Sequence, residues 1–145
     1  MKQLVFCLFA VCCWWLADAS SAECSERKLK EVRRELEGVN NTLQNRELLL
    51  TTPPENIEEG CCLSALRCFR DSIQENIKST VTLQRRLYKS LNHSQTAACL
   101  NFCHSENATC QTCNSHPQEK VGEFFSRLDS FIQKAISKLR SSAAN

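Results

Sequence analysis

The cysteines of this chain constrain its fold more than any other feature of the sequence. One group runs from Cys61 through Cys62 to Cys68, and a second pair, Cys110 and Cys113, precedes a long amphipathic segment. Three of the eleven cysteines precede residue 23, which leaves eight in the rest of the chain. An even number of cysteines in an exported chain predicts a disulfide framework, although eight cysteines permit roughly a hundred pairings.

The first 22 residues are predicted to be a secretory signal peptide. Lys2 precedes an apolar run, Leu4 to Leu16, of about 13 residues, which is too short to span a bilayer. Small residues follow this run and place the cleavage site after Ala19 or Ala22. We therefore expect a single secreted domain of residues 23–145 that does not insert into a membrane.

Cys110 and Cys113 have His104 and His116 nearby, so zinc is a rival interpretation of this pair. Export favours disulfides over zinc, because the compartment is oxidising. The full chain has a net charge of +2, and removing residues 1–22 takes away one lysine and one aspartate. This charge is too small to predict a nucleic-acid partner.

Apolar side chains recur every three or four residues in four stretches, which predicts amphipathic helices. We expect these helices at about 25–46, 62–78, 80–91 and 119–140. One continuous helix across Ser79-Thr80 is the alternative for the second and third. No stretch alternates like a strand, so the sequence predicts an all-α domain.

The predicted connections are long, short and long, at residues 47–60, about 79–80 and 92–118. Long crossovers let consecutive helices run parallel, and this order is typical of an up-up-down-down short-chain cytokine bundle. Two parallel bridges between the two cysteine groups would pin the second crossover against the second helix.

Catalysis is disfavoured by the residues inside the first cysteine group. Its spacing matches the secreted phospholipase A2 signature, but Ala65 and Leu66 stand where the catalytic histidine and aspartate would be. The three histidines lie in the polar second connection without a motif around them, so we expect no enzyme, metal or cofactor. A saposin-like helical lipid binder is the alternative class. It would need cysteines near both chain ends, whereas only Cys24 lies near the start.

Three sequons are candidate N-glycosylation sites in an exported chain. They begin at Asn40, Asn92 and Asn107.

Three stretches together resemble the interleukin-15/interleukin-21 family of cytokines, and most closely its interleukin-21 branch. The first is Pro54-Glu55-Asn56-Ile57-Glu58-Glu59 followed by Cys61-x6-Cys68-Phe69, and the second is Cys110-x-x-Cys113-Asn114-Ser115. The third is Glu123-Phe124-Phe125-x-x-Leu128-x-Ser130-Phe131-Ile132-Gln133-Lys134-x-Ile136. The resemblance covers most of the mature chain, and interleukin-15 or interleukin-2 remain close alternatives.

The resemblance implies a monomeric secreted cytokine that bridges two type I cytokine receptor chains. It implies disulfides Cys61–Cys110 and Cys68–Cys113, and contact of Gln133 and Ile136 with the shared common gamma chain. The residues that it implies for the private receptor are charged and lie on the first and third helices: Lys28, Lys30, Glu31, Arg34, Glu37, Arg85, Arg86 and Lys89.

This chain departs from the family pattern at four additional cysteines, namely Cys24, Cys62, Cys99 and Cys103, whose partners the sequence leaves open. Cys62 competes with its neighbour Cys61 for a partner. Arg34 stands where the family leads us to expect an acidic residue, so the contact with the private receptor is expected to be charge-swapped.

Overall fold

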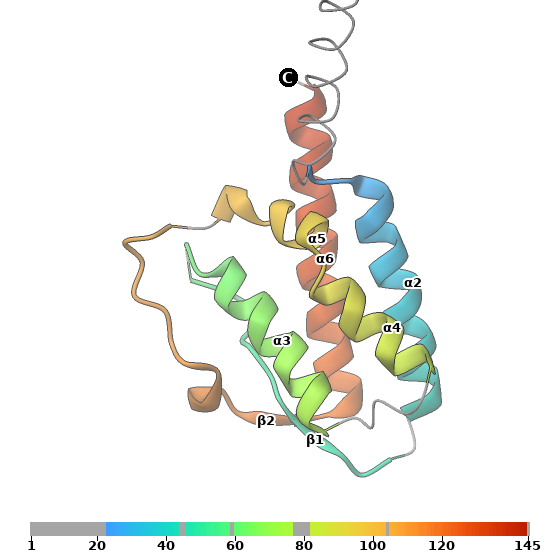
Figure 1. Ribbon diagram of the computed structural model, residues 1–145. Helices are drawn as coiled ribbons and strands as arrows, with labels where there is room; N and C mark the ends of the chain where they lie inside the picture. Colours follow the sequence, from blue (N-terminus) through green and yellow to red (C-terminus); the bar gives the residue numbers. More distant parts are fainter. Residues whose placement is uncertain (1–22, 44–45, 59, 77–81, 104, 145) are drawn as a thin grey trace, which may run out of the picture.

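The chain forms a helical bundle with one small sheet (Figure 1). This computed structural model describes residues 23–43, 46–58, 60–76, 82–103 and 105–144, so the expected signal peptide lies outside the described residues. The α-helices of the described part are α2 Glu26–Leu43, α3 Cys62–Asn76, α4 Thr82–Leu91, α5 Ser94–Ala98 and α6 Val121–Ala144.

Helix α2 forms where the apolar spacing predicts it. Its buried residues are Leu29, Val32, Leu36, Val39 and Leu43, spaced by three and four along the helix. The carbonyl of Ser25 accepts the first helical hydrogen bonds, from the amides of residues 28 and 29. The helix ends at residue 43, three residues before the expected boundary.

The other helices also follow their predicted ranges, with shifted ends. Helices α3 and α4 are separate, and residues 77–81, which contain the expected break, lie outside the described part. Helix α6 begins two residues later than expected and continues four residues further, to Ala144. Periodicity locates the apolar face of a helix better than it locates the ends, where exposed residues carry little of the pattern.

The described residues are mostly helical, as expected, and they also contain a small two-stranded sheet that the sequence did not predict. Strand β1, Leu49–Thr51, pairs antiparallel with β2, Gln118–Lys120, with Leu50 opposite Glu119. Each strand has three residues, which is too short to display an alternating pattern in the sequence. The pairing joins the two long connections, which also contain α5 and two 3₁₀ turns, Asn101–Cys103 and Cys113–Ser115.

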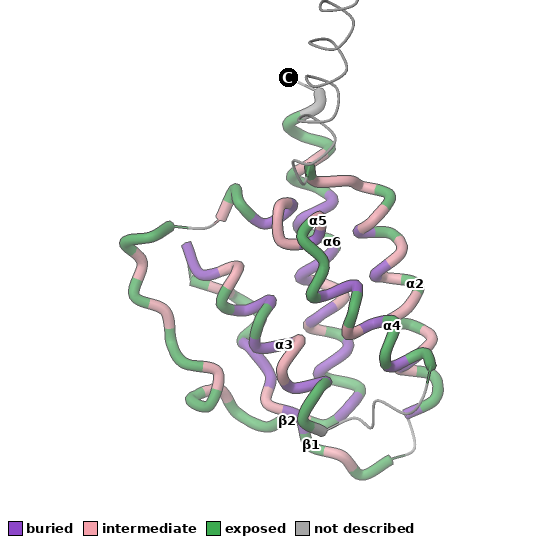
Figure 2. Tube along the Cα trace, viewed as in Figure 1, coloured by how far each residue is buried: buried purple, intermediate pink, exposed green. Residues whose placement is uncertain are grey.

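A cluster of phenylalanines fills the centre of the bundle, where the buried sides of the helices meet (Figure 2). The Phe69 ring of α3 meets Phe124 of α6 edge-on, with ring centroids 5.4 Å apart. Phe69 also lies 5.6 Å from Phe131, and Phe124 lies 5.2 Å from Phe125. Edge-on and tilted contacts at these distances are favourable for aromatic rings, so the cluster holds α3 against α6.

Helix α2 runs antiparallel to both α6 and α4. Its first residue, Glu26, pairs with Arg140 near the end of α6, while Arg33 pairs with Asp129 further back along that helix. On the other flank, the amine of Lys28 lies 3.5 Å from the hydroxyl of Ser90 at the end of α4. Helix α2 therefore lies between α6 and α4 and packs against both.

Four disulfides link the described cysteines. Cys61 bonds to Cys110 and Cys68 to Cys113, which are the two pairs that the family resemblance implied. The sequence left the other partners open, and the structure joins Cys62 to Cys103 and Cys24 to Cys99. Cys62 thus bonds to a different part of the second connection from its neighbour and does not compete with it.

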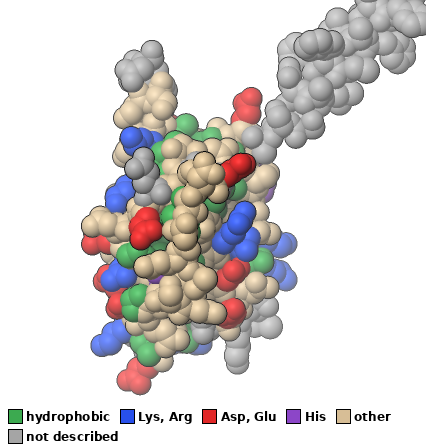
Figure 3. Space-filling view, turned by 90° about the vertical axis from the view of Figure 1, so that its left-hand side faces the viewer, with side chains coloured by type: hydrophobic (Ala, Val, Ile, Leu, Met, Phe, Trp, Pro, Cys, Tyr) green, Lys and Arg blue, Asp and Glu red, His purple; other side chains and the backbone are tan. Residues whose placement is uncertain are grey.

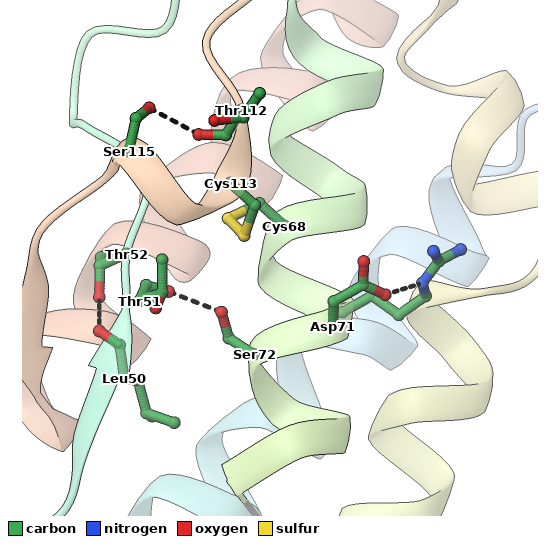
Figure 4. Close-up of a disulfide and its surroundings, with 10 residues drawn as sticks. Leu50, Thr51, Thr52, Cys68, Asp71, Ser72, Thr112, Cys113 and Ser115 are labelled. Atoms are coloured by element: carbon green, nitrogen blue, oxygen red, sulfur yellow. Dashed lines mark hydrogen bonds and ion pairs between the residues drawn. A yellow bond between two sulfur atoms is a disulfide. The ribbon is translucent and has the colours of Figure 1, made fainter.

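The Cys68–Cys113 bridge ties the second connection to α3 next to the sheet (Figure 4). One turn along α3, the hydroxyl of Ser72 donates to the carbonyl of Thr51 in β1, at 2.7 Å. The buried hydroxyl of Thr52 donates to the carbonyl of Leu50, also at 2.7 Å. Both bonds satisfy polar groups inside the fold, and the bond from Ser72 also secures the first connection to α3.

Gly60 makes the turn into α3 and cannot be replaced without strain. Its φ of 86° lies in the left-handed region, which residues with a Cβ rarely adopt. A Cβ at this position would lie 2.8 Å from the Cβ of Ala108 and 2.9 Å from that of Ser105. The glycine therefore allows the second connection to pass close to the start of α3.

Candidate interaction surfaces

The first candidate surface lies between α2 and α6, and a series of polar contacts links the two helices there. The guanidinium of Arg33 donates to Asp129, with Nε 2.8 Å from Oδ1. The side-chain amide of Gln133 donates to the other oxygen of Asp129, at 2.7 Å. Gln133 is exposed, so its polar group lies at the surface and is oriented by contacts that reach across to α2.

A shallow hollow runs along this surface, and Lys30, Arg34 and Glu37 lie on its α2 side. Lys30 pairs with Glu26 at 3.6 Å, while Arg34 and Glu37 are exposed. The hydrogen bond from Arg140, 2.6 Å long, is the main cause that lowers the pKa of Glu26. The hollow therefore carries charges of both signs. It is lined by Glu26, Arg27, Lys30, Arg33, Arg34, Leu36, Glu37, Asn40, Gly122, Phe125, Ser126 and Asp129.

The second candidate surface lies between α2 and α4. Lys28 approaches Ser90 of α4 and pairs with Glu31, 3.6 Å away, on its own helix. The first-helix residues implied for one receptor are thus divided: Lys28 and Glu31 lie toward α4, whereas the others line the hollow toward α6. Helical spacing placed them all on the polar side of α2, but only the packed neighbours separate its two flanks.

Three basic residues of α4 that were predicted as binding residues are exposed, namely Arg85, Arg86 and Lys89. Their apolar neighbours on the other side of the helix, Leu87 and Leu91, are buried in the core. The structure therefore presents the basic side of α4 to solvent.

Gln133 and Ile136 of α6, both predicted to contact the shared receptor chain, differ in their exposure to solvent. The side chain of Ile136 is only 6% exposed and belongs to the core cluster, one helical turn from the fully buried Ile132. Ile136, predicted as a receptor contact, is therefore largely buried, because this position continues the apolar side of α6. Gln133 alone of the pair is available at the surface.

The three sequon asparagines differ in their surroundings. Asn92 and Asn107 are exposed, and the Oδ1 atom of Asn92 accepts a hydrogen bond from Arg70 at 2.9 Å. Asn40 is half-buried beside the α2–α6 hollow, and its Oδ1 atom is buried without a hydrogen-bond partner. A glycan on Asn40 would therefore lie against the first surface, unlike one on Asn107.

Glu35 on α2 is a half-buried carboxylate that sequence reasoning missed. Its Oε2 atom is buried without a hydrogen-bond partner, as is the Oε1 atom of Gln84 on α4. Burial is the main cause that raises the pKa of Glu35, and the Ser90 hydroxyl and the Lys28 charge oppose it. Glu35 lies seven residues from Lys28, two helical turns along α2, and this spacing could have indicated their shared flank.

Replacing Glu35 by glutamine is expected to change how stability depends on pH. Because the folded pKa of Glu35 is raised, its contribution to stability is complete below the unfolded pKa and is lost as pH rises through the folded value. Because glutamine does not ionise, the Glu35→Gln variant does not lose this stability as pH rises. The stability of the variant relative to wild type should therefore increase from acidic to neutral pH in denaturant titrations, and a constant difference would contradict the assignment.

No group of three or more histidine, cysteine or acidic side chains among the described residues is placed to hold a metal ion. A comparison with the models of known protein families finds none that matches the chain.

Proposed function

We propose that this protein is a secreted cytokine, similar to interleukin-21, that binds a private receptor chain and the shared common gamma chain and brings the two together. The observation that carries this proposal is the position of α2 between α4 and α6. One helix thereby contributes to two separate exposed surfaces, as a monomer that bridges two partners requires. Juxtaposed receptor tails then start kinase signalling inside a lymphocyte.

The proposed fold is the up-up-down-down short-chain bundle. It is supported by the antiparallel contacts of α2 with α6 and with α4, at Glu26–Arg140 and Lys28–Ser90. The pairing of β1 with β2 also supports it, because the strands lie in two long connections that pass side by side.

Secretion is supported by the four disulfides, which form and persist in oxidising compartments. Within the described residues, no helix has both the length and the apolar character required to cross a membrane.

We assign the α2–α6 surface to the shared chain, with the Arg33–Asp129 pair within it and Gln133 at its edge, bonded to Asp129. The α2–α4 surface is assigned to the private receptor, through Lys28, Glu31 and the basic residues of α4. A few residues usually dominate the affinity of such interfaces, and tryptophan, tyrosine and arginine are enriched among them. This assignment leaves Ile136 in the core.

The test is the substitution Gln133→Asp in the secreted chain. A carboxylate at position 133 repels the neighbouring carboxylate of Asp129, and the substitution removes the amide donor, so affinity for the shared chain should fall by about 30-fold or more. Binding to the private receptor should be retained, while signalling in lymphocytes is lost. Both affinities are measured by surface plasmon resonance on immobilised receptor ectodomains, with phosphorylation of the signalling kinase as the cellular readout.

Gln111→Asp is the matched control, because it introduces the same charge at an exposed position of the second connection. It should bind both receptor chains like wild type. If Gln133→Asp left the affinity for the shared chain unchanged, the assignment of α6 to the shared-chain surface would be wrong. Tight binding to lipid vesicles by a chain that binds neither receptor would instead favour the saposin-like lipid binder.

A further inference from the structure

Five of the nine basic residues of α2 and α6 form ion pairs with nearby carboxylates. Lys30 pairs with Glu26 and Arg33 pairs with Asp129. On α6, Arg127 pairs with Glu123 at 2.8 Å, one helical turn away. Positive charge on these helices is therefore partly matched by carboxylates of the same two helices, which also carry several acidic residues.

Helix α4 differs, because none of its ten residues is acidic. Arg85, Arg86 and Lys89 are exposed, and none of the three forms an ion pair with any described residue. Lys89 lies in the last turn, where a positive charge favours the helix dipole, but the two arginines have no such role. The positive charges of these two arginines are thus left without a carboxylate partner among the described residues.

These three side chains project from the same side of the helix. Arg85 and Lys89 are four residues apart and Arg86 and Lys89 are three apart, so the charges follow the helix axis over about 6 Å. Arg70 of α3 donates to Asn92 immediately after α4, but Asp71 pairs with it at 3.0 Å, so Arg70 adds no unmatched charge to the strip. The positive strip consists of Arg85, Arg86 and Lys89, and α4 lies on the viewer's side of the bundle in Figure 1.

Not every face of the molecule carries a strip of positive side chains. On the face beside the connection between α5 and α6, acidic and basic side chains are interspersed among uncharged ones (Figure 3). The charge of the whole chain is only +2, so the strip is a local excess and does not follow from overall composition.

We propose that the positive strip of α4 binds a sulfated polysaccharide. Guanidinium groups present planar donor pairs that match oxyanions, and a row of them suits a linear chain with repeated anionic groups. Helix α4 itself contains no carboxylate to repel the ligand, and the proposed export of the protein would expose it to extracellular polysaccharides. Because the same strip belongs to the α2–α4 surface, a bound polysaccharide would compete there with a protein partner.

An anionic membrane fits this strip less well. A helix that lies in a membrane interface needs an exposed apolar side, but Leu87 and Leu91 are buried in the bundle. Leu83 is the one large apolar side chain of α4 with substantial exposure, at 38%. The strip therefore offers charge and hydrogen-bond donors with little to insert into lipid.

The experiment measures binding of the secreted, disulfide-bonded chain to immobilised heparin at physiological salt. The test variant combines Arg85→Gln, Arg86→Gln and Lys89→Gln, which preserve helix propensity. The matched control combines Lys120→Gln, Lys134→Gln and Lys138→Gln, which remove the same charge from other exposed positions. Circular dichroism verifies that both variants are folded.

We expect the α4 variant to bind heparin about 10-fold to 100-fold more weakly, and the control to stay within about 3-fold of wild type. Binding of wild type should weaken as salt is raised, and unsulfated hyaluronan should bind poorly. Equal losses in the two variants would overturn the proposal, as would no heparin binding by wild type. Binding to anionic phospholipid vesicles, but not to heparin, would also overturn it. The measurement uses no receptor, so its failure leaves the Gln133 test intact.

Discussion

Replacing Phe69 by alanine is expected to lower the free energy of unfolding by about 3–5 kcal/mol. The ring is fully buried and contacts both Phe124 and Phe131 of α6, so its removal leaves a cavity at the contact between α3 and α6. For a domain of this size, that loss is a large part of the total stability. Guanidinium denaturation followed by circular dichroism measures it.

Phe102→Ala is the matched control, because it removes the same atoms from a side chain that is 52% exposed. It should destabilise the chain by less than about 1 kcal/mol. Similar losses for the two variants would show that the aromatic cluster does not form the centre of the core.

Removing the Cys24–Cys99 disulfide, by Cys24→Ser with Cys99→Ala, is expected to destabilise the chain by about 4 kcal/mol. The bridge joins residues 75 apart in the sequence, so in the chain-entropy account it restricts the unfolded chain strongly. In the fold it holds the residues before α2 against the end of α5. Alanine suits position 99, since the Cys99 side chain is buried in the core.

The measurement is the midpoint and slope of guanidinium denaturation, compared with wild type under non-reducing conditions. Peptide mapping without reduction is the control, and it should find Cys61–Cys110, Cys62–Cys103 and Cys68–Cys113 intact in the variant. A loss of less than about 1 kcal/mol with these three bridges intact would contradict the expected role of the first bridge. A Cys110–Cys113 bond in wild type would contradict the pairing itself.

The positions of the long helices could be predicted because each buries a continuous apolar side. The residues of α2 from Leu29 to Leu43 show this, since the repeat in the sequence and the buried set agree. The ends of the helices were less predictable, as α6 continues through exposed residues that carry no apolar repeat. Strands β1 and β2 could not be found from local pattern, because each is stabilised by a partner about 70 residues away.

The sequence predicted which residues belong to the candidate surfaces, but not how those residues are arranged. Exposure of Arg85, Arg86, Lys89 and Gln133 followed from helical spacing, whereas Ile136, predicted beside Gln133 as a contact, is buried. The resemblance to a family suggested that Ile136 acts at a surface, whereas its spacing from Ile132 indicates the core. The Arg33–Asp129 contact was missed, since nothing local relates two charges 96 residues apart.

The sequence by itself determined which segments are helical and which side of each is apolar, because these properties depend on neighbours three and four residues away. It also indicated that the cysteines form a disulfide framework. Only the tertiary structure decided the partners of Cys62 and Cys24, the division of α2 between two surfaces, and the unmatched charge of α4. Those features depend on contacts between residues distant in the chain, which form only when the helices pack together.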